Sequence, residues 1–140
     1  MMKKIFEGRF ALSVFHNEEY NYIILKWRSF RISLEEIQEM HRIILDYALG
    51  HGCEIYVADS SDTTSVLSED IIAWWKNEWV GELIKNGIKM IITILPRDIL
   101  AQQSTFDWQK AGYEKIVMPN VFSLEQAENK IREYHHCIID

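Results

Sequence analysis

Residues 53–70 read CEIYVADSSDTTSVLSED, and this stretch decides the fold. Cys53 to Ala58 is a short apolar run of strand length. The seven residues from Asp59 to Ser65, called the polar tract below, are all small and polar and predict a loop. Ser68, followed by two acids, predicts a helix start, because acidic side chains complement the positive end of the helix dipole. We therefore expect the polar tract at the carboxyl edge of a parallel sheet, directly ahead of an amphipathic helix.

Upstream of this stretch the sequence predicts a hairpin and then a helix. Residues 5–15 alternate between apolar and polar side chains, which is typical of an antiparallel strand with one wet face. Residues 16–19 form a polar break, and residues 20–27 are rich in aromatic and β-branched side chains, so the two runs are interpreted as a hairpin. Ser33 and Glu36 fit a capping box, and apolar residues then recur every three or four positions. Glycines at 50 and 52 end this helix.

Downstream, strands and helices continue to alternate. The helix that starts at Ser68 has an apolar stripe of Ile72, Trp75, Trp79, Val80 and Leu83. Residues 88–95 predict a strand that Pro96 ends. Two short helices over 97–103 and 106–111, a strand over 113–118 and a last helix opened by the capping box Ser123/Gln126 complete the chain. The prediction is a single α/β domain over 1–140, with a mixed sheet of about five strands and about four helices.

Composition excludes several classes of partner. The chain has 140 residues and a formal charge of −6, which argues against nucleic acid and against an anionic membrane surface. The longest apolar run, residues 90–95, is far too short to span a membrane, and no signal-peptide pattern follows the first lysines. We expect a cytoplasmic, reduced protein, in which Cys53 is a small buried residue.

Catalytic and metal-binding signatures are missing from the sequence. It contains no Gly-x-Ser-x-Gly elbow, P-loop or Gly-x-Gly-x-x-Gly motif. His135, His136 and Cys137 are adjacent, so on a helix they point in different directions and do not suit one ion. We expect neither a metal nor another cofactor, and a serine nucleophile in the polar tract would need a positioned base.

Ligands of open α/β sheets gather beyond the carboxyl ends of the strands, where the polar tract and Arg97 should meet. Two interpretations of the tract remain open: an anion site at the helix start, which Glu69 and Asp70 oppose, and a solvated loop with an ordinary N-cap. Trp74 points about 100° away from Trp75 on a helix. It is interpreted either as a side chain packed at the rim of the core or as part of a partner or ligand contact.

The order of elements resembles the STAS and SpoIIAA-like families. Three local features carry this resemblance: the strand ending at Asp59-Ser60 before a polar loop and the helix start at Ser68; the acids and tryptophans that lead to Gly87-Ile88-Lys89; and the final Val121-Phe122-Ser123-Leu124-Glu125-Gln126-Ala127. Anti-sigma-factor antagonists of this fold are phosphorylated on a serine within Asp-Ser-Ser-Gly. Asp59-Ser60-Ser61-Asp62 matches three of those four residues, and Ser68 matches the position at the helix start.

The resemblance implies a non-enzymatic regulatory or binding module. Its working surface would be the 59–70 loop with the Trp74 helix, contacting a protein partner or a small ligand. The expected site residues are Asp59, Ser60, Ser61 and Ser68 as phosphoacceptor or partner surface, and Trp74 and Arg97 as ligand or interface contacts. The alternative is a small apolar-ligand carrier of the SEC14-like kind, with an apolar cavity of roughly 300 Å³ or more. An enzyme is the third alternative, and the chain is expected to be a monomer or a homodimer.

Overall fold

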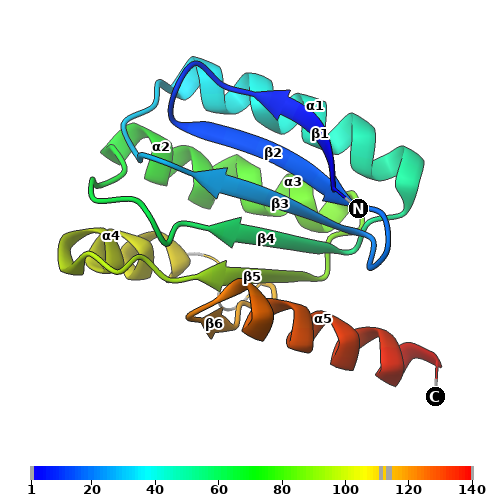
Figure 1. Cartoon of the computed structure of the whole chain (residues 1–140). Coiled ribbons are helices and arrows are strands. Elements are labelled where there is room, and N and C mark those ends of the chain that lie inside the picture. Colours follow the sequence, from blue (N-terminus) through cyan, green and yellow to red (C-terminus); the bar gives the residue numbers. More distant parts are fainter. Residues whose placement is uncertain (1, 111, 113–114, 140) are drawn as a thin grey trace.

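A single six-stranded sheet organises the chain, as the computed structural model in Figure 1 shows for residues 2–110, 112 and 115–139. The strands lie in chain order across the sheet. The first three are antiparallel to one another, and the third to the sixth are parallel. The predicted α/β class, with an antiparallel N-terminal part and parallel strands after it, is confirmed. The strands are β1 Met2–Glu7, β2 Leu12–Asn17, β3 Tyr22–Trp27, β4 Ile55–Asp59, β5 Met90–Ile94 and β6 Asn120–Val121.

Helices cover both faces of the sheet. One face packs on α1, on the helix formed by α2, η1 and α3, and on α4, and the opposite face packs on α5. Alternate residues of β4 serve the two cores, because successive strand side chains point to opposite faces: Tyr56 faces α1 and α2, whereas Ile55 and Val57 face α5. The helices are α1 Leu34–His51, α2 Glu69–Trp74, the π-helical η1 Trp75–Trp79, α3 Val80–Lys85, α4 Ile99–Gln109 and α5 Leu124–Ile139.

The predicted single strand over residues 5–15 is wrong. A turn at 8–11 divides it into β1 and β2, which raises the strand count to six. The Gly8 N–H donates to the Leu12 carbonyl at 2.8 Å. A Cβ on Gly8 would lie 2.9 Å from that same carbonyl oxygen, so the close approach needs glycine. The apolar alternation stays in phase across the turn, at Phe6, Leu12 and Val14. For this reason the alternation pattern gave no sign of the turn.

Two further predictions near the C-terminus are corrected. Residues 97–112 were expected to hold two short helices, but one helix, α4, runs through most of this segment after Asp98 caps it by accepting from the Ala101 N–H at 3.0 Å. The last strand is β6, not residues 113–118, of which 113 and 114 lie outside the described residues. Val117 makes only an isolated bridge to Met90, because Pro119, which has no N–H, interrupts the ladder before β6.

Candidate functional site

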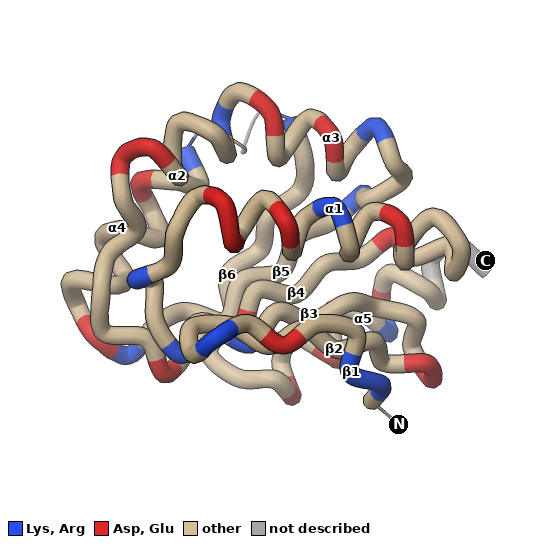
Figure 2. Tube along the Cα trace, turned by 90° about the horizontal axis from the view of Figure 1, so that it is seen from above, with Lys and Arg blue, Asp and Glu red and all other residues tan. Residues whose placement is uncertain are grey.

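The polar tract lies at the carboxyl edge of the sheet, next to the end of β5. The Ser60 N–H donates to the Ile94 carbonyl at 3.1 Å, and the Arg97 N–H donates to the Ser61 carbonyl at 3.3 Å. The Arg97 guanidinium also pairs with the Asp62 carboxylate at 2.5 Å. The tract and Arg97 therefore meet at one edge, as the sequence predicts. Figure 2, in which this edge lies on the left, shows basic and acidic residues side by side there.

The three candidate serines have different environments. Ser60 is buried, and its hydroxyl donates to the Ile94 carbonyl at 2.9 Å. The half-buried Ser61 donates to Asp59 Oδ1 at 2.7 Å. Ser68 is exposed at the start of α2, but its hydroxyl donates to the Asp70 carboxylate and makes no cap to the helix backbone. The predicted helix start is correct and the side-chain cap is wrong, because Asp70 holds the hydroxyl. Of the three, Ser61 and Ser68 are the ones that solvent reaches.

Trp74 lies in the core rather than on the surface. It is 9% exposed, stacks on Trp79 with ring centroids 4.9 Å apart, and contacts the His41 ring edge-on at 5.3 Å. The π-helical segment η1 explains this position. It adds one residue to the turn, so the buried face passes from Ile71 and Trp74 in α2 to residues 80 and 83 in α3. Purely α-helical spacing would put Trp74 off this buried stripe, and the extra residue of η1 brings it back. Of the two interpretations of Trp74, the one that packs it against the core is therefore correct.

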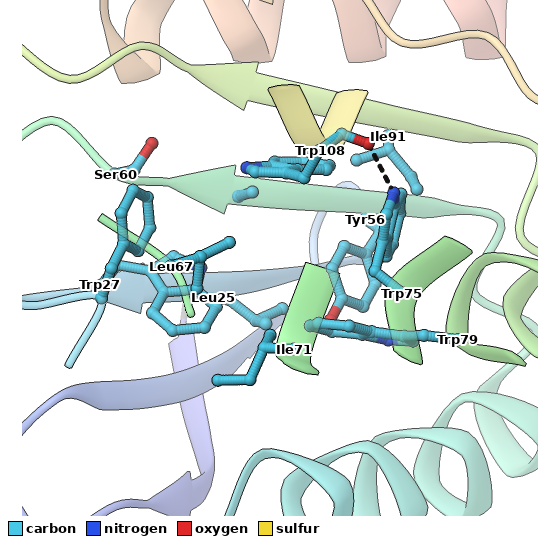
Figure 3. A pocket seen from close by; sticks show the side chains of 12 residues that line it. Leu25, Trp27, Tyr56, Ser60, Leu67, Ile71, Trp75, Trp79, Ile91 and Trp108 are labelled. Carbon is cyan, nitrogen blue, oxygen red and sulfur yellow. Dashed lines mark hydrogen bonds between the residues drawn. The ribbon is translucent and has the colours of Figure 1, made fainter. Parts of the chain in front are cut away.

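An apolar pocket, called the aromatic slot below, lies behind the polar tract (Figure 3). Its cavity volume is about 30 Å³. Strand alternation brings Tyr56 and Ala58 of β4, and Ser60 directly after it, to one wall, and helix α4 adds Trp108 to another. Sequence analysis missed Tyr56 and Trp108: the alternation in β4 could have indicated the first, but the segment around the second had no legible periodicity. The slot is lined by Leu25, Trp27, Phe30, Tyr56, Ala58, Ser60, Leu67, Ile71, Trp75, Trp79, Ile91 and Trp108.

Three buried polar groups of the slot have no hydrogen-bond partner among the described residues: the Tyr56 hydroxyl and the indole Nε1 of Trp79 and of Trp108. The Trp75 indole, by contrast, donates to the Trp108 carbonyl at 2.8 Å, the dashed line of Figure 3. Burial raises the pKa of Tyr56 well above its ordinary value. The Trp79 indole beside it acts in the opposite direction but lacks hydrogen-bond geometry. The phenol is therefore neutral at physiological pH.

Histidines lie away from the serines of the tract. His41 is buried between Trp74 and Trp79, and burial lowers its pKa to about 4. Its Nε2 lies 3.6 Å from a Glu82 carboxylate oxygen. His16, toward the opposite edge of the sheet, contacts Tyr47 and Asn21. The hydroxyls of Ser60 and Ser61 donate instead to the Ile94 carbonyl and the Asp59 carboxylate, so within the described residues neither serine is paired with a histidine base.

Several exposed apolar side chains lie at the same carboxyl edge as the polar tract. Val66, Ile99, Leu100 and Phe122, called the edge patch below, are between 54% and 80% exposed. All four follow the carboxyl ends of β4, β5 or β6. The Leu67 N–H donates to Ser104 Oγ, one helical turn beyond Leu100, so the segment just after the polar tract lies against α4. Phe10 is also exposed at this edge, in the β1–β2 turn.

Comparison with known proteins adds no assignment. Within the described residues, no helix is long and apolar enough to span a membrane. In that same part of the chain no group of three or more His, Cys, Asp or Glu side chains could hold a metal ion. No protein-family model, no curated protein and no solved structure matches the chain.

Proposed function

We propose that the chain is a non-enzymatic binding module of the STAS-like kind, which docks a protein partner on the carboxyl edge of its sheet. The observation that carries this proposal is the edge patch beside the polar tract. Apolar patches of more than roughly a few hundred Å² are rare on soluble monomers and often mark interaction sites. Burying an exposed Ile, Leu or Phe side chain in an interface contributes roughly 1.5–3 kcal/mol each.

The surroundings of the patch suit a protein interface. Such interfaces have an apolar centre and a polar rim. Here Ile99 and Leu100 stand next to each other at the start of α4, and the Asp62–Arg97 pair, 72% and 79% exposed at its side chains, lies beside them. Both flanking segments are anchored to the sheet through β4 and β5, so the surface is presented on a rigid scaffold.

Ser61 and Ser68 support a regulated version of this docking. Both lie on the segment that borders the patch and both reach solvent. A phosphate adds roughly −1.5 to −2 charges, next to Asp59 for Ser61 and next to Asp70 for Ser68. The added charge would act by repelling or reshaping the partner surface rather than by binding the helix start.

The two alternatives receive less support. A carrier needs a cavity near 300 Å³, and the slot offers about 30 Å³. An enzyme needs an activated nucleophile, and the hydroxyls of Ser60 and Ser61 are bonded to a carbonyl and a carboxylate.

The test uses a double variant, Ile99→Asp with Leu100→Asp, and a matched control, Leu49→Asp. Aspartate in the first turn of α4 complements the helix dipole, so the fold is retained. Leu49 is also exposed, at 61% against 80% for Ile99 and 68% for Leu100, but lies at the end of α1, at the opposite edge. A protein captured from an extract of the native cell is identified, purified and titrated by calorimetry.

We expect the wild type and Leu49→Asp to bind the purified partner equally. The double variant should bind more weakly by at least about a hundredfold, because two buried side chains are lost. Equal binding by the double variant, or capture that the Leu49 control also loses, would refute docking through the edge patch.

A further inference from the structure

The aromatic slot shows a feature that partner docking does not use. Nearly all buried polar groups in proteins are hydrogen-bonded, and an unpaired one costs roughly 1–3 kcal/mol. The slot holds three of them, on Tyr56, Trp79 and Trp108. All three side chains are at least nine-tenths buried. A cluster of unpaired groups in one pocket indicates that the pocket has a further occupant.

The unpaired groups define what the occupant must offer. An indole N–H donates and cannot accept, so the Trp79 and Trp108 indoles each need an acceptor, whereas a neutral phenol can donate or accept. Figure 3 shows the Tyr56 hydroxyl close to Trp79, and the Trp108 nitrogen toward Ser60 at the other end of the slot. Both ends therefore require a hydrogen-bond acceptor. Among the described residues no Lys, Arg, Asp, Glu or His lines the slot, so a charged ligand would be buried there without a counter-charge.

The walls define the rest of the ligand. Trp27, Phe30, Tyr56, Trp75, Trp79 and Trp108 are flat aromatic surfaces, which pack well against another ring. The π-helical segment η1 holds Trp75 and Trp79 in the wall, and such segments occur frequently at functional sites. We propose that the aromatic slot binds a neutral, planar, mostly apolar molecule with a carbonyl oxygen, which accepts from the Trp79 or Trp108 indole.

Binding must be coupled to a movement that enlarges the slot. An engineered cavity of about 150 Å³ admits benzene, whereas this slot has about 30 Å³. Leu67 lines the slot just beyond the polar tract, and we infer that this segment is the cover that moves. Two serine hydroxyls hold it in place. Ser65 Oγ accepts from the Phe30 N–H at 2.8 Å, and Ser104 Oγ accepts from the Leu67 N–H at 3.0 Å. Releasing either bond lowers the cost of opening.

The experiment follows the indole N–H signals of ¹⁵N-labelled protein by NMR while acetophenone or ethylbenzene is added. The two probes have nearly the same shape, and acetophenone alone carries a carbonyl oxygen. We expect acetophenone to bind about tenfold more tightly, the usual value of one hydrogen bond to a buried donor. The Trp79 or Trp108 N–H signal should move downfield with acetophenone and not with ethylbenzene. Trp75, already bonded to the Trp108 carbonyl, is the internal reference.

A variant of the cover gives a second readout. Ser104→Ala removes the acceptor of the Leu67 N–H, so the open state is more populated and acetophenone should bind several-fold more tightly. Equal affinities for the two probes, or no change in the Trp79 and Trp108 signals at saturating acetophenone, would overturn the proposal. No partner protein enters this experiment, so its failure leaves the docking proposal untouched.

Discussion

Replacing Tyr56 by Phe should not destabilise the protein, although Tyr56 is almost completely buried. Among the described residues its hydroxyl has no hydrogen-bond partner, so burying it destabilises the folded state by roughly 1–3 kcal/mol. Removing the hydroxyl leaves the ring packing unchanged. The free energy of unfolding should therefore stay the same or rise by up to about that amount.

Tyr22 supplies the matched control on the neighbouring strand. It is also fully buried, but its hydroxyl donates to the Glu128 carboxylate at 3.0 Å and accepts from the Asn17 amide at 3.5 Å. A hydrogen bond to a charged group contributes about 1.5–3 kcal/mol, so Tyr22→Phe should lower the free energy of unfolding by about that amount. The two variants should thus differ by about 2 kcal/mol or more.

Urea unfolding followed by circular dichroism at pH 7 measures both variants, and an unchanged m-value shows that the comparison is valid. A loss of more than about 1 kcal/mol in Tyr56→Phe would refute the reasoning, because it would mean that the hydroxyl has a partner inside the protein. A stable Tyr22→Phe variant would refute the value assigned to the Glu128 bond.

Three further predictions concern the core, the first turn and the serines. The pKa of His41 is about 4 in the folded chain and about 6.5 when unfolded, so the unfolded state binds a proton more readily. The free energy of unfolding should therefore fall as the pH drops from 6.5 toward 4, by about 2 kcal/mol at pH 5. Urea unfolding of His41→Leu should not show this loss. Gly8→Ala should lower the free energy of unfolding by about 1–3 kcal/mol, since its Cβ would meet the Leu12 carbonyl. Gly81→Ala, in open space within α3, should leave stability unchanged or raise it, and a Gly8→Ala protein that melts like the wild type would show that the contact is unimportant. Intact-mass and fragment analysis of protein from its native cell should find phosphate on Ser61 or Ser68 and none on the buried Ser60, so a phosphorylated Ser60 would contradict the structure.

The parts of the fold that depend on local chemistry were predictable. The Ser33 and Ser123 hydroxyls cap α1 and α5 by accepting from the N–H three residues on, as the sequence indicates. The apolar run before Asp59 becomes β4, and Pro96 follows the end of β5 closely. These features depend on neighbours in sequence, so residue types alone identify them.

The missed features depend on contacts between distant segments or on one-residue changes in phase. The turn at Gly8 keeps the alternation of the strands beside it, and the π-helical turn at Trp75–Trp79 shifts the buried face of its helix by one position. Neither leaves a periodic signal. Helix α4 has its apolar residues divided between the core, at Ala101 and Trp108, and the exposed pair Ile99 and Leu100, so it shows no single stripe.

The candidate site was predictable only in its outline. The polar tract and Arg97 share the carboxyl edge because parallel strands end together, a rule that needs no coordinates. The aromatic slot needed the structure, because Leu25, Tyr56 and Trp108 come from three elements far apart in the chain. For Trp74, helix geometry alone allowed either a core or a surface position. Only the tertiary packing in the structure shows that it is buried.

The most direct test of the carboxyl edge as working surface is a backbone amide NMR map of ¹⁵N-labelled protein, recorded in buffer and in native-cell extract. The account predicts that perturbed signals lie at residues 8–11, 60–68, 96–100 and 122, all at that edge. Perturbations gathered instead around residues 49–54, 86–89 and 117, at the opposite ends of the strands, would contradict it.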